Sequence, residues 1–92
     1  MVKLDIVLTK DANAVSVQIH IDAVGVPLDG EGKGTDTVSD GAHIYAVYLF
    51  GPPGSMVDFK IDQGGKHLAS GPPLVVGAGH DKAVGFGRIT TL

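Results

Sequence analysis

Glycine and proline interrupt this chain so often that no long amphipathic helix fits into it. Among its 92 residues are 14 glycines and 5 prolines, and both residue types weaken or end helices. Apolar and polar residues alternate instead, most clearly from Val15 to Asp22. Because successive side chains of a strand point to opposite faces, this alternation predicts a strand with one face in a core and one in water.

Similar short segments recur at spacings of about ten residues, which is typical of β-sandwiches and small barrels. The segment His43 to Phe50 is apolar on both faces and predicts the central, most buried strand. Gln63-Gly64-Gly65 predicts a hairpin turn. We therefore expect one all-β domain over residues 1–92. It should be a small antiparallel β-sandwich, immunoglobulin-like or jelly-roll-like, with seven or eight short strands.

Two regions depart from regular alternation. After Asp22 the apolar positions shift by one residue, which predicts a β-bulge or bend near Ala23–Gly25 that could pass the chain to a second sheet. Residues 29–41 are polar, glycine-rich and acidic, and form the longest stretch without a clear strand. Within them, residues 35–38 could form a short edge strand.

Composition excludes several classes of function. There is no cysteine, so disulfides and thiolate zinc sites are excluded. Ten acidic residues stand against seven scattered basic ones, which argues against nucleic-acid binding. The longest apolar run, Ile44 to Phe50, is far shorter than the roughly 20 residues of a membrane helix. Asp5 interrupts the apolar start of the chain, so we expect no signal peptide and a cytoplasmic location or export by a signal-free route.

The acidic segment has the spacing of a cation-binding loop. Its carboxylates recur along the chain, glycines allow sharp turns, and the last acid is twelfth in the loop. Lys33 at a ligand position and the lack of flanking helices favour a solvated acidic loop instead. A calcium site remains the alternative, with the ligands Asp29, Glu31, Asp36 and Asp40.

A second loop, residues 77–82, begins like a dinucleotide-binding turn. The third glycine position is Lys82, and too few residues follow to complete a βαβ unit, so we reject that interpretation. The loop is then a glycine-rich connection between strands. An anion or polyol site remains a hypothesis here, formed by Gly77, Gly79, His80, Asp81 and Lys82.

The last predicted strand contains Gly85-Phe86-Gly87. Its two glycines share one face, which leaves that face without side chains. One interpretation is that a large neighbouring side chain packs into the space. The other is a flat surface on which another subunit or an extended peptide docks, with Gly85, Phe86 and Gly87 at the interface.

No catalytic constellation is visible in the sequence. None of the serines stands in a nucleophile-elbow sequence, and Glu31 is the only glutamate. We expect His43 to form a hydrogen bond with Asp40 rather than to bind a metal. The leading hypothesis is a non-enzymatic module for self-assembly or protein docking through sheet edges. The alternative is a lectin-like, glycan-binding domain that uses loops 29–41 and 77–82, with or without calcium.

Overall fold

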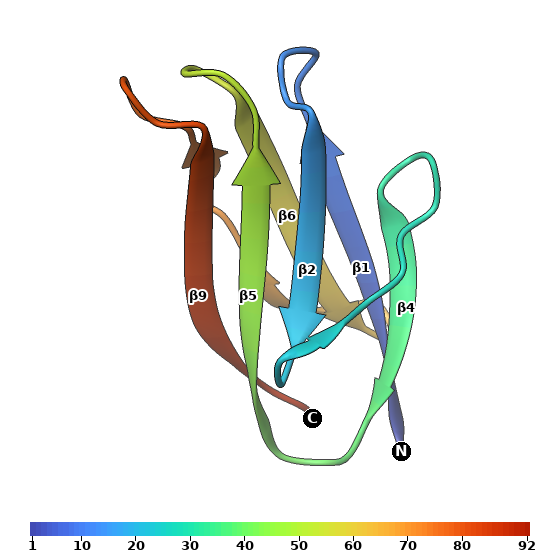
Figure 1. Ribbon diagram of the computed structural model, residues 1–92. Helices are drawn as coiled ribbons and strands as arrows, with labels where there is room; N and C mark the ends of the chain where they lie inside the picture. The colour runs from blue at the N-terminus through green and yellow to red at the C-terminus, as the bar shows by residue number, and fades with distance from the viewer.

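The computed structural model describes residues 1–92 and contains two antiparallel sheets packed face to face (Figure 1). Sheet A has the order β4-β1-β6-β7, with β8 paired to β6, and sheet B has the order β3-β2-β5-β9. This confirms the predicted all-β sandwich. The strands are β1 (Val2–Lys10), β2 (Ser16–Ile21), β3 (Val24–Gly25), β4 (Lys33–Val38), β5 (Ala42–Phe50), β6 (Met56–Gln63), β7 (Lys66–Ser70), β8 (Leu74–Val75) and β9 (Lys82–Thr90).

The core lies between the two sheets and is formed by the alternating apolar residues. Each fully buried leucine or isoleucine contributes about 1.5–3 kcal/mol relative to an exposed one, so these positions determine which face of each strand points inward. The most deeply buried large side chains are Leu4, Ile6 and Leu8 of β1, Ile19 of β2, Val47 and Leu49 of β5, Val57 and Ile61 of β6, Val76, and Ile89 of β9.

A tight hairpin, not a bulge, causes the shift in alternation after β2. Ile21 pairs with Val24, and the two residues between them, Asp22 and Ala23, have φ angles of 50° and 67°. Positive φ at both central residues is the pattern of a type I′ turn. Of the two features predicted near Ala23–Gly25, the bulge is wrong and the bend is this turn, and β3 stays in the same sheet as β2.

The acidic segment forms an edge strand that is longer than expected. β4 begins at Lys33 and pairs with β1 at the edge of sheet A. The preceding segment, residues 27–28, crosses close over Gly34. A Cβ at Gly34 would overlap the carbonyl oxygen of Pro27, so glycine is required at this crossing.

β5 is central, as predicted, and pairs with β2 and β9. It is not buried on both faces, because Ile44 is 58% exposed on the outer face of sheet B. The hairpin predicted at residues 63–65 is confirmed, and Gly64 and Gly65 have φ angles of 56° and 84°. The structure contains no helix with the length and apolarity needed to cross a membrane.

Candidate interaction surface

β9 leaves one side of its backbone unpaired. It pairs only with β5, and two hydrogen bonds fix the phase of that pairing. The Gly51 N–H donates to the Asp81 carbonyl, and the Thr91 N–H donates to the Gly41 carbonyl, both at 2.9 Å. Because bonded and non-bonded positions alternate along an antiparallel pair, the even-numbered residues of β9 direct their backbone groups away from the sheet. These residues are Lys82, Val84, Phe86, Arg88 and Thr90.

The other sheet edges carry features that discourage pairing with another chain. β3 has two residues, and β4 presents Lys33 and Asp36. β7 is short, has an irregular register with β6, and is followed by Gly71-Pro72-Pro73. β9 is nine residues long, contains no proline and carries charge only at Lys82 and Arg88. Between these two charges, residues 83–87 carry neither charge nor proline, and such an edge segment is a template for strand addition.

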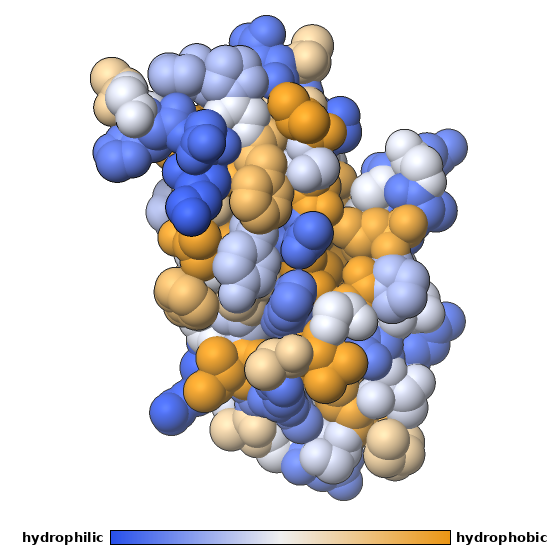
Figure 2. Space-filling model, in the orientation of Figure 1, coloured by the Kyte–Doolittle hydropathy of each residue, from blue (hydrophilic) through white to orange (hydrophobic).

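An exposed apolar patch lies beside this edge, on the outer face of sheet B. Phe86 is 71% exposed and Val84 is 39% exposed. The register places them next to Ala46 and Tyr48 of β5. Figure 2 views this face and shows hydrophobic side chains over β5 and β9. The apolar patch consists of the exposed Ile44, Val84 and Phe86 and, between them, the half-buried Tyr48 and the buried Ala46.

The two glycines of β9 face the core and are covered by other side chains. A Cβ at Gly87 would overlap the ring of Tyr45, and a Cβ at Gly85 would lie 2.8 Å from Cδ2 of Leu74. The glycine face therefore accommodates packing and is not an open docking surface, which corrects one of the two interpretations of this strand. Among the three predicted interface residues, Phe86 is the one exposed on the outer face.

Loop 77–82 brings three of its predicted site residues into one groove. The His80 N–H donates to the Gly77 carbonyl at 3.1 Å, and Gly79 has a φ of 80°, so the glycines form the turn. His80, Asp81 and Lys82 line a groove of about 510 Å³. Its other lining residues are Val15, Phe50, Gly51, Pro52 and Pro53. Ligand binding at this groove stays a prediction.

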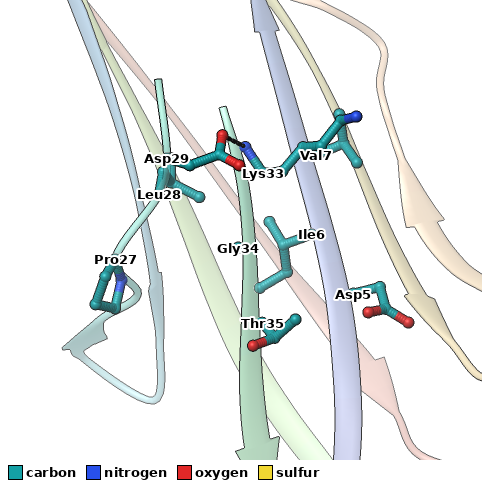
Figure 3. Close-up of a pocket in the computed structure, with 9 residues that line it drawn as sticks. All are labelled: Asp5, Ile6, Val7, Pro27, Leu28, Asp29, Lys33, Gly34 and Thr35. Carbon is teal, nitrogen blue, oxygen red and sulfur yellow. Dashed lines mark hydrogen bonds between the residues drawn. The ribbon is translucent and has the colours of Figure 1, made fainter. Parts of the chain in front are cut away.

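The carboxylate of Asp29 is occupied by the backbone of its own loop. Asp29 Oδ1 accepts hydrogen bonds from the N–H groups of Lys33, at 3.0 Å, and Glu31, at 2.8 Å. These two bonds hold the pKa of Asp29 below its ordinary value, and the bond from Lys33 has the larger effect. Lys33 Nζ also lies 3.4 Å from Glu31 Oε2. Figure 3 shows Asp29 and Lys33 at the rim of a groove of about 670 Å³ that also includes Ile6 and Thr35.

The structure does not gather the four predicted calcium ligands. Asp29 and Glu31 lie in the turn before β4, Asp36 lies within β4, and Asp40 lies in the turn after it. The Asp36 carboxylate accepts a hydrogen bond from the Thr37 N–H at 2.9 Å. No group of three or more His, Asp or Glu side chains is arranged to hold a metal ion.

His43 is bound to Asp22 and Ser39, and not to Asp40 as the sequence suggested. Its ring is 6% exposed, with Nδ1 at 2.5 Å from Asp22 Oδ2 and Nε2 at 2.7 Å from the Ser39 carbonyl. Both partners are acceptors, an arrangement that favours hydrogens on both ring nitrogens and therefore the charged imidazole. The Asp22 hydrogen bond, and then the Ser39 carbonyl, raise the pKa of His43. This contact ties the β2–β3 hairpin to the turn between β4 and β5.

A second histidine lies in a chain of hydrogen bonds that the sequence did not reveal. His67 Nδ1 is 3.0 Å from Asp62 Oδ1, and His67 Nε2 is 3.0 Å from Ser70 Oγ. Lys60 Nζ lies 3.4 Å from the other carboxylate oxygen of Asp62. Regular alternation puts residues 67 and 70 on opposite faces of a strand. The register shift between Ile61 and Asp62 changes this, and no local sequence pattern indicates that shift.

Comparisons with models of protein families, with curated proteins and with solved structures found no match for this chain. The fold and the arrangement of its own residues are therefore the basis for assigning a function.

Proposed function

We propose that this chain is a non-enzymatic interaction module that self-associates by pairing β9 with β9 of a second copy. The observation that supports the proposal is the unpaired nine-residue edge of β9 beside the exposed apolar patch. Strand addition supplies backbone hydrogen bonds, and cross-strand contact between the Val84 and Phe86 side chains of the two β9 strands supplies hydrophobic stabilisation. Association would also support a small core that has no disulfides.

The direction of the free backbone groups selects a register for this dimer. Only even-numbered residues of β9 point outward, so bonded pairs must join two even-numbered residues. An antiparallel pairing centred on Phe86 meets this condition and forms about ten backbone hydrogen bonds, two for each bonded pair. It places Val84 opposite the partner's Arg88 and Lys82 opposite the partner's Thr90. No like charges then lie directly opposite each other, which would be destabilising.

The test of self-association is the absolute mass in solution, measured by light scattering after size exclusion. We expect twice the 9.4 kDa mass of the chain. Val84→Pro removes an N–H that faces outward and takes no part in pairing with β5, so this variant should have the mass of one chain. Val84→Thr keeps the N–H and is the matched control, which should stay dimeric. A wild-type monomer at every concentration, or a dimeric Val84→Pro variant, would show that the proposal is wrong.

Cysteine cross-linking tests the register, because the chain has no cysteine of its own. Directly opposed bonded residues have Cα atoms about 5.5 Å apart, within the range that a disulfide bridges. Phe86→Cys should cross-link to itself under mild oxidation. Val84→Cys and Arg88→Cys should cross-link efficiently only when the two variants are mixed. Thr37→Cys, on the edge strand β4, is the control that should stay monomeric on a denaturing gel.

A second candidate function, glycan binding, is favoured by the groove at loop 77–82. Phe50 lies in this groove with His80, Asp81 and Lys82, which combines an aromatic ring with polar groups. Loop 29–41 lies on the opposite side of the molecule, so we assign this candidate to loop 77–82 alone (Figure 1). A panel of oligosaccharides, titrated by NMR, should shift the amide signals of the groove, and Asp81→Ala should weaken binding. No shift with any sugar would remove this candidate.

A further inference from the structure

We propose that Ser70 is an activated nucleophile that accepts acyl groups from small activated esters. The observation is the hydrogen-bonded chain from Ser70 through His67 to Asp62, with both bonds at 3.0 Å. A serine hydroxyl, a histidine and a carboxylate in this order form the arrangement that activates serine in hydrolases of unrelated folds. This site lies on sheet A and is independent of the β9 edge on sheet B.

The β6–β7 hairpin holds the three side chains on the outer face of sheet A. Asp62 pairs with His67 in the register, and Lys60 pairs with Ser70. The irregular register between them brings His67 and Ser70 to the same face, as bulges beside active sites do. Asp62 is 20% exposed, and each of its carboxylate oxygens has one partner, His67 on Oδ1 and Lys60 on Oδ2. These contacts orient the imidazole.

The Asp62 contact places a hydrogen on Nδ1 of His67. Asp62 is an acceptor, so Nδ1 carries the hydrogen and donates it to the carboxylate. In the neutral imidazole Nε2 then carries a lone pair, and the hydroxyl of Ser70, 3.0 Å away, can donate to it. His67 is therefore placed to take the Ser70 proton as the oxygen attacks a carbonyl carbon.

The acyl transfer balances without any other reagent. Ser70 Oγ forms a bond to the ester carbonyl carbon while its proton moves to His67 Nε2. The bond from that carbon to the leaving oxygen then breaks, and the leaving oxygen takes the proton from His67. The products are O-acyl-Ser70 and a free alcohol or phenol.

Exposure of the site defines the class of substrate. The side chain of His67 is 51% exposed, so the surrounding surface contacts little of a bound ester. Little binding energy is then available to lower the barrier for an unreactive ester. The substrates are therefore small acyl groups on good leaving groups, such as phenyl esters.

Labelling with p-nitrophenyl acetate tests the proposal. Intact mass should rise by one acetyl group, and peptide mapping should place it on Ser70. His67→Ala should slow acetylation of Ser70 about 100-fold, because a positioned general base contributes 10²–10⁴-fold. Asp62→Asn should also slow it, because it destabilises the required tautomer. Thr9→Ala, which removes an exposed hydroxyl elsewhere on sheet A, should change nothing.

Three outcomes would overturn the proposal. The first is acetylation of Ser70 no faster than that of the exposed Ser39, quantified in the same peptide map. The second is an unchanged Ser70 rate in His67→Ala with an unchanged circular dichroism spectrum. The third is nitrophenol release by Ser70→Ala at the wild-type rate, which would mean that His67 reacts as a free imidazole. The Val84→Pro monomer should label like the wild type, so this result is separate from self-association.

Discussion

The two residues of the β2–β3 turn have the same left-handed backbone conformation, but only one of them has side-chain hydrogen bonds that stabilise it. Asp22, with a φ of 50°, accepts hydrogen bonds from His43 and from the Ile44 N–H. Ala23, with a φ of 67°, has no polar side chain to compensate for this conformation. A residue with a Cβ in the left-handed region is strained by roughly 1–2 kcal/mol. The turn therefore stores strain at Ala23 and not at Asp22.

Ala23→Gly should raise the free energy of unfolding by about 1 kcal/mol, because glycine adopts positive φ without steric strain. Urea unfolding of the Val84→Pro monomer, with and without the change, measures this without a contribution from association. Ala12→Gly is the matched control in the β1–β2 turn, where φ is not positive. It should not raise the free energy of unfolding. An equal gain at both positions would contradict the assignment of strain to Ala23.

The Asp22–His43 pair should make stability depend on pH in two directions. The pKa of His43 is raised above its ordinary 6.5, so its contribution is complete below that value and is lost as pH rises through the folded pKa. Asp22 has a pKa lowered below its ordinary 3.8, chiefly by the His43 hydrogen bond. Its contribution is complete above 3.8 and is lost as pH falls through the folded pKa. Asp36 also faces His43 and adds to the raised pKa.

Thermal unfolding of the Val84→Pro monomer as a function of pH measures both effects. Asp22→Asn keeps a residue that tolerates the turn conformation but removes the charge. We expect a shallower fall in unfolding temperature on the alkaline side for this variant. Identical profiles with and without Asp22→Asn would contradict a role for the ion pair.

At the scale of elements, the two faces of β9 differ: one packs in the core and the other is exposed. Its inner face has glycines at the positions where Tyr45 and Leu74 pack, and its outer face carries the apolar patch. Tyr45 packs against Phe59 of the opposite sheet, with ring centroids 5.4 Å apart. The glycines of β9 therefore allow a large aromatic side chain to bridge the two sheets.

Gly87→Ala should lower the free energy of unfolding by about 1–3 kcal/mol, because the new methyl group overlaps the ring of Tyr45. Gly85→Ala should lower the free energy of unfolding by a smaller amount, because the new methyl group meets the flexible end of Leu74. Chemical unfolding of both variants, each in the Val84→Pro monomer, gives the comparison. A larger loss at Gly85 would contradict the packing described for β9.

Sequence patterns predicted elements where burial alone determines the alternation. β2 followed from alternating apolar residues, and the glycine hairpin at residues 63–65 from turn chemistry. β3 was misread because a bulge and a two-residue turn give the same shift of phase. β4 was predicted too short because its polar residues give no inward-facing pattern.

The candidate sites were harder to predict because they depend on contacts between distant residues. Asp22 and His43 are 21 residues apart, and only the pairing of β2 with β5 brings them together. Asp29 looked like a cation ligand from spacing alone, but its own loop supplies the amides that bind it. The free edge of β9 could not be predicted either, because a single sequence does not determine the order of strands in a sheet.

At the scale of the whole molecule, the proposed dimer would join two sandwiches through one continuous sheet. Sheet B ends at β9, so pairing of two β9 strands extends the order to β2-β5-β9 followed by β9-β5-β2 of the partner. Sheet A takes no part in this contact, and the Ser70 site stays open to solvent in the dimer. Assembly and acyl transfer are therefore separable properties.

The midpoint temperature of thermal unfolding should rise with protein concentration, because association stabilises the folded state by mass action. A calorimetric series over two orders of magnitude in concentration measures this. The Val84→Pro variant should unfold at one temperature throughout the series. A constant midpoint for the wild type, with the dimer mass unchanged, would mean that association does not contribute to stability.

The order of strands in sheet A has a consequence for synthesis on the ribosome. β1 is translated before both of its partners, β4 and β6, so its backbone has no complete set of paired neighbours until residue 63 has left the exit tunnel. In sheet B, β5 likewise has only one of its two neighbours until β9 has been synthesised. Non-local pairing of this kind makes folding slow and leaves apolar strands open in the meantime.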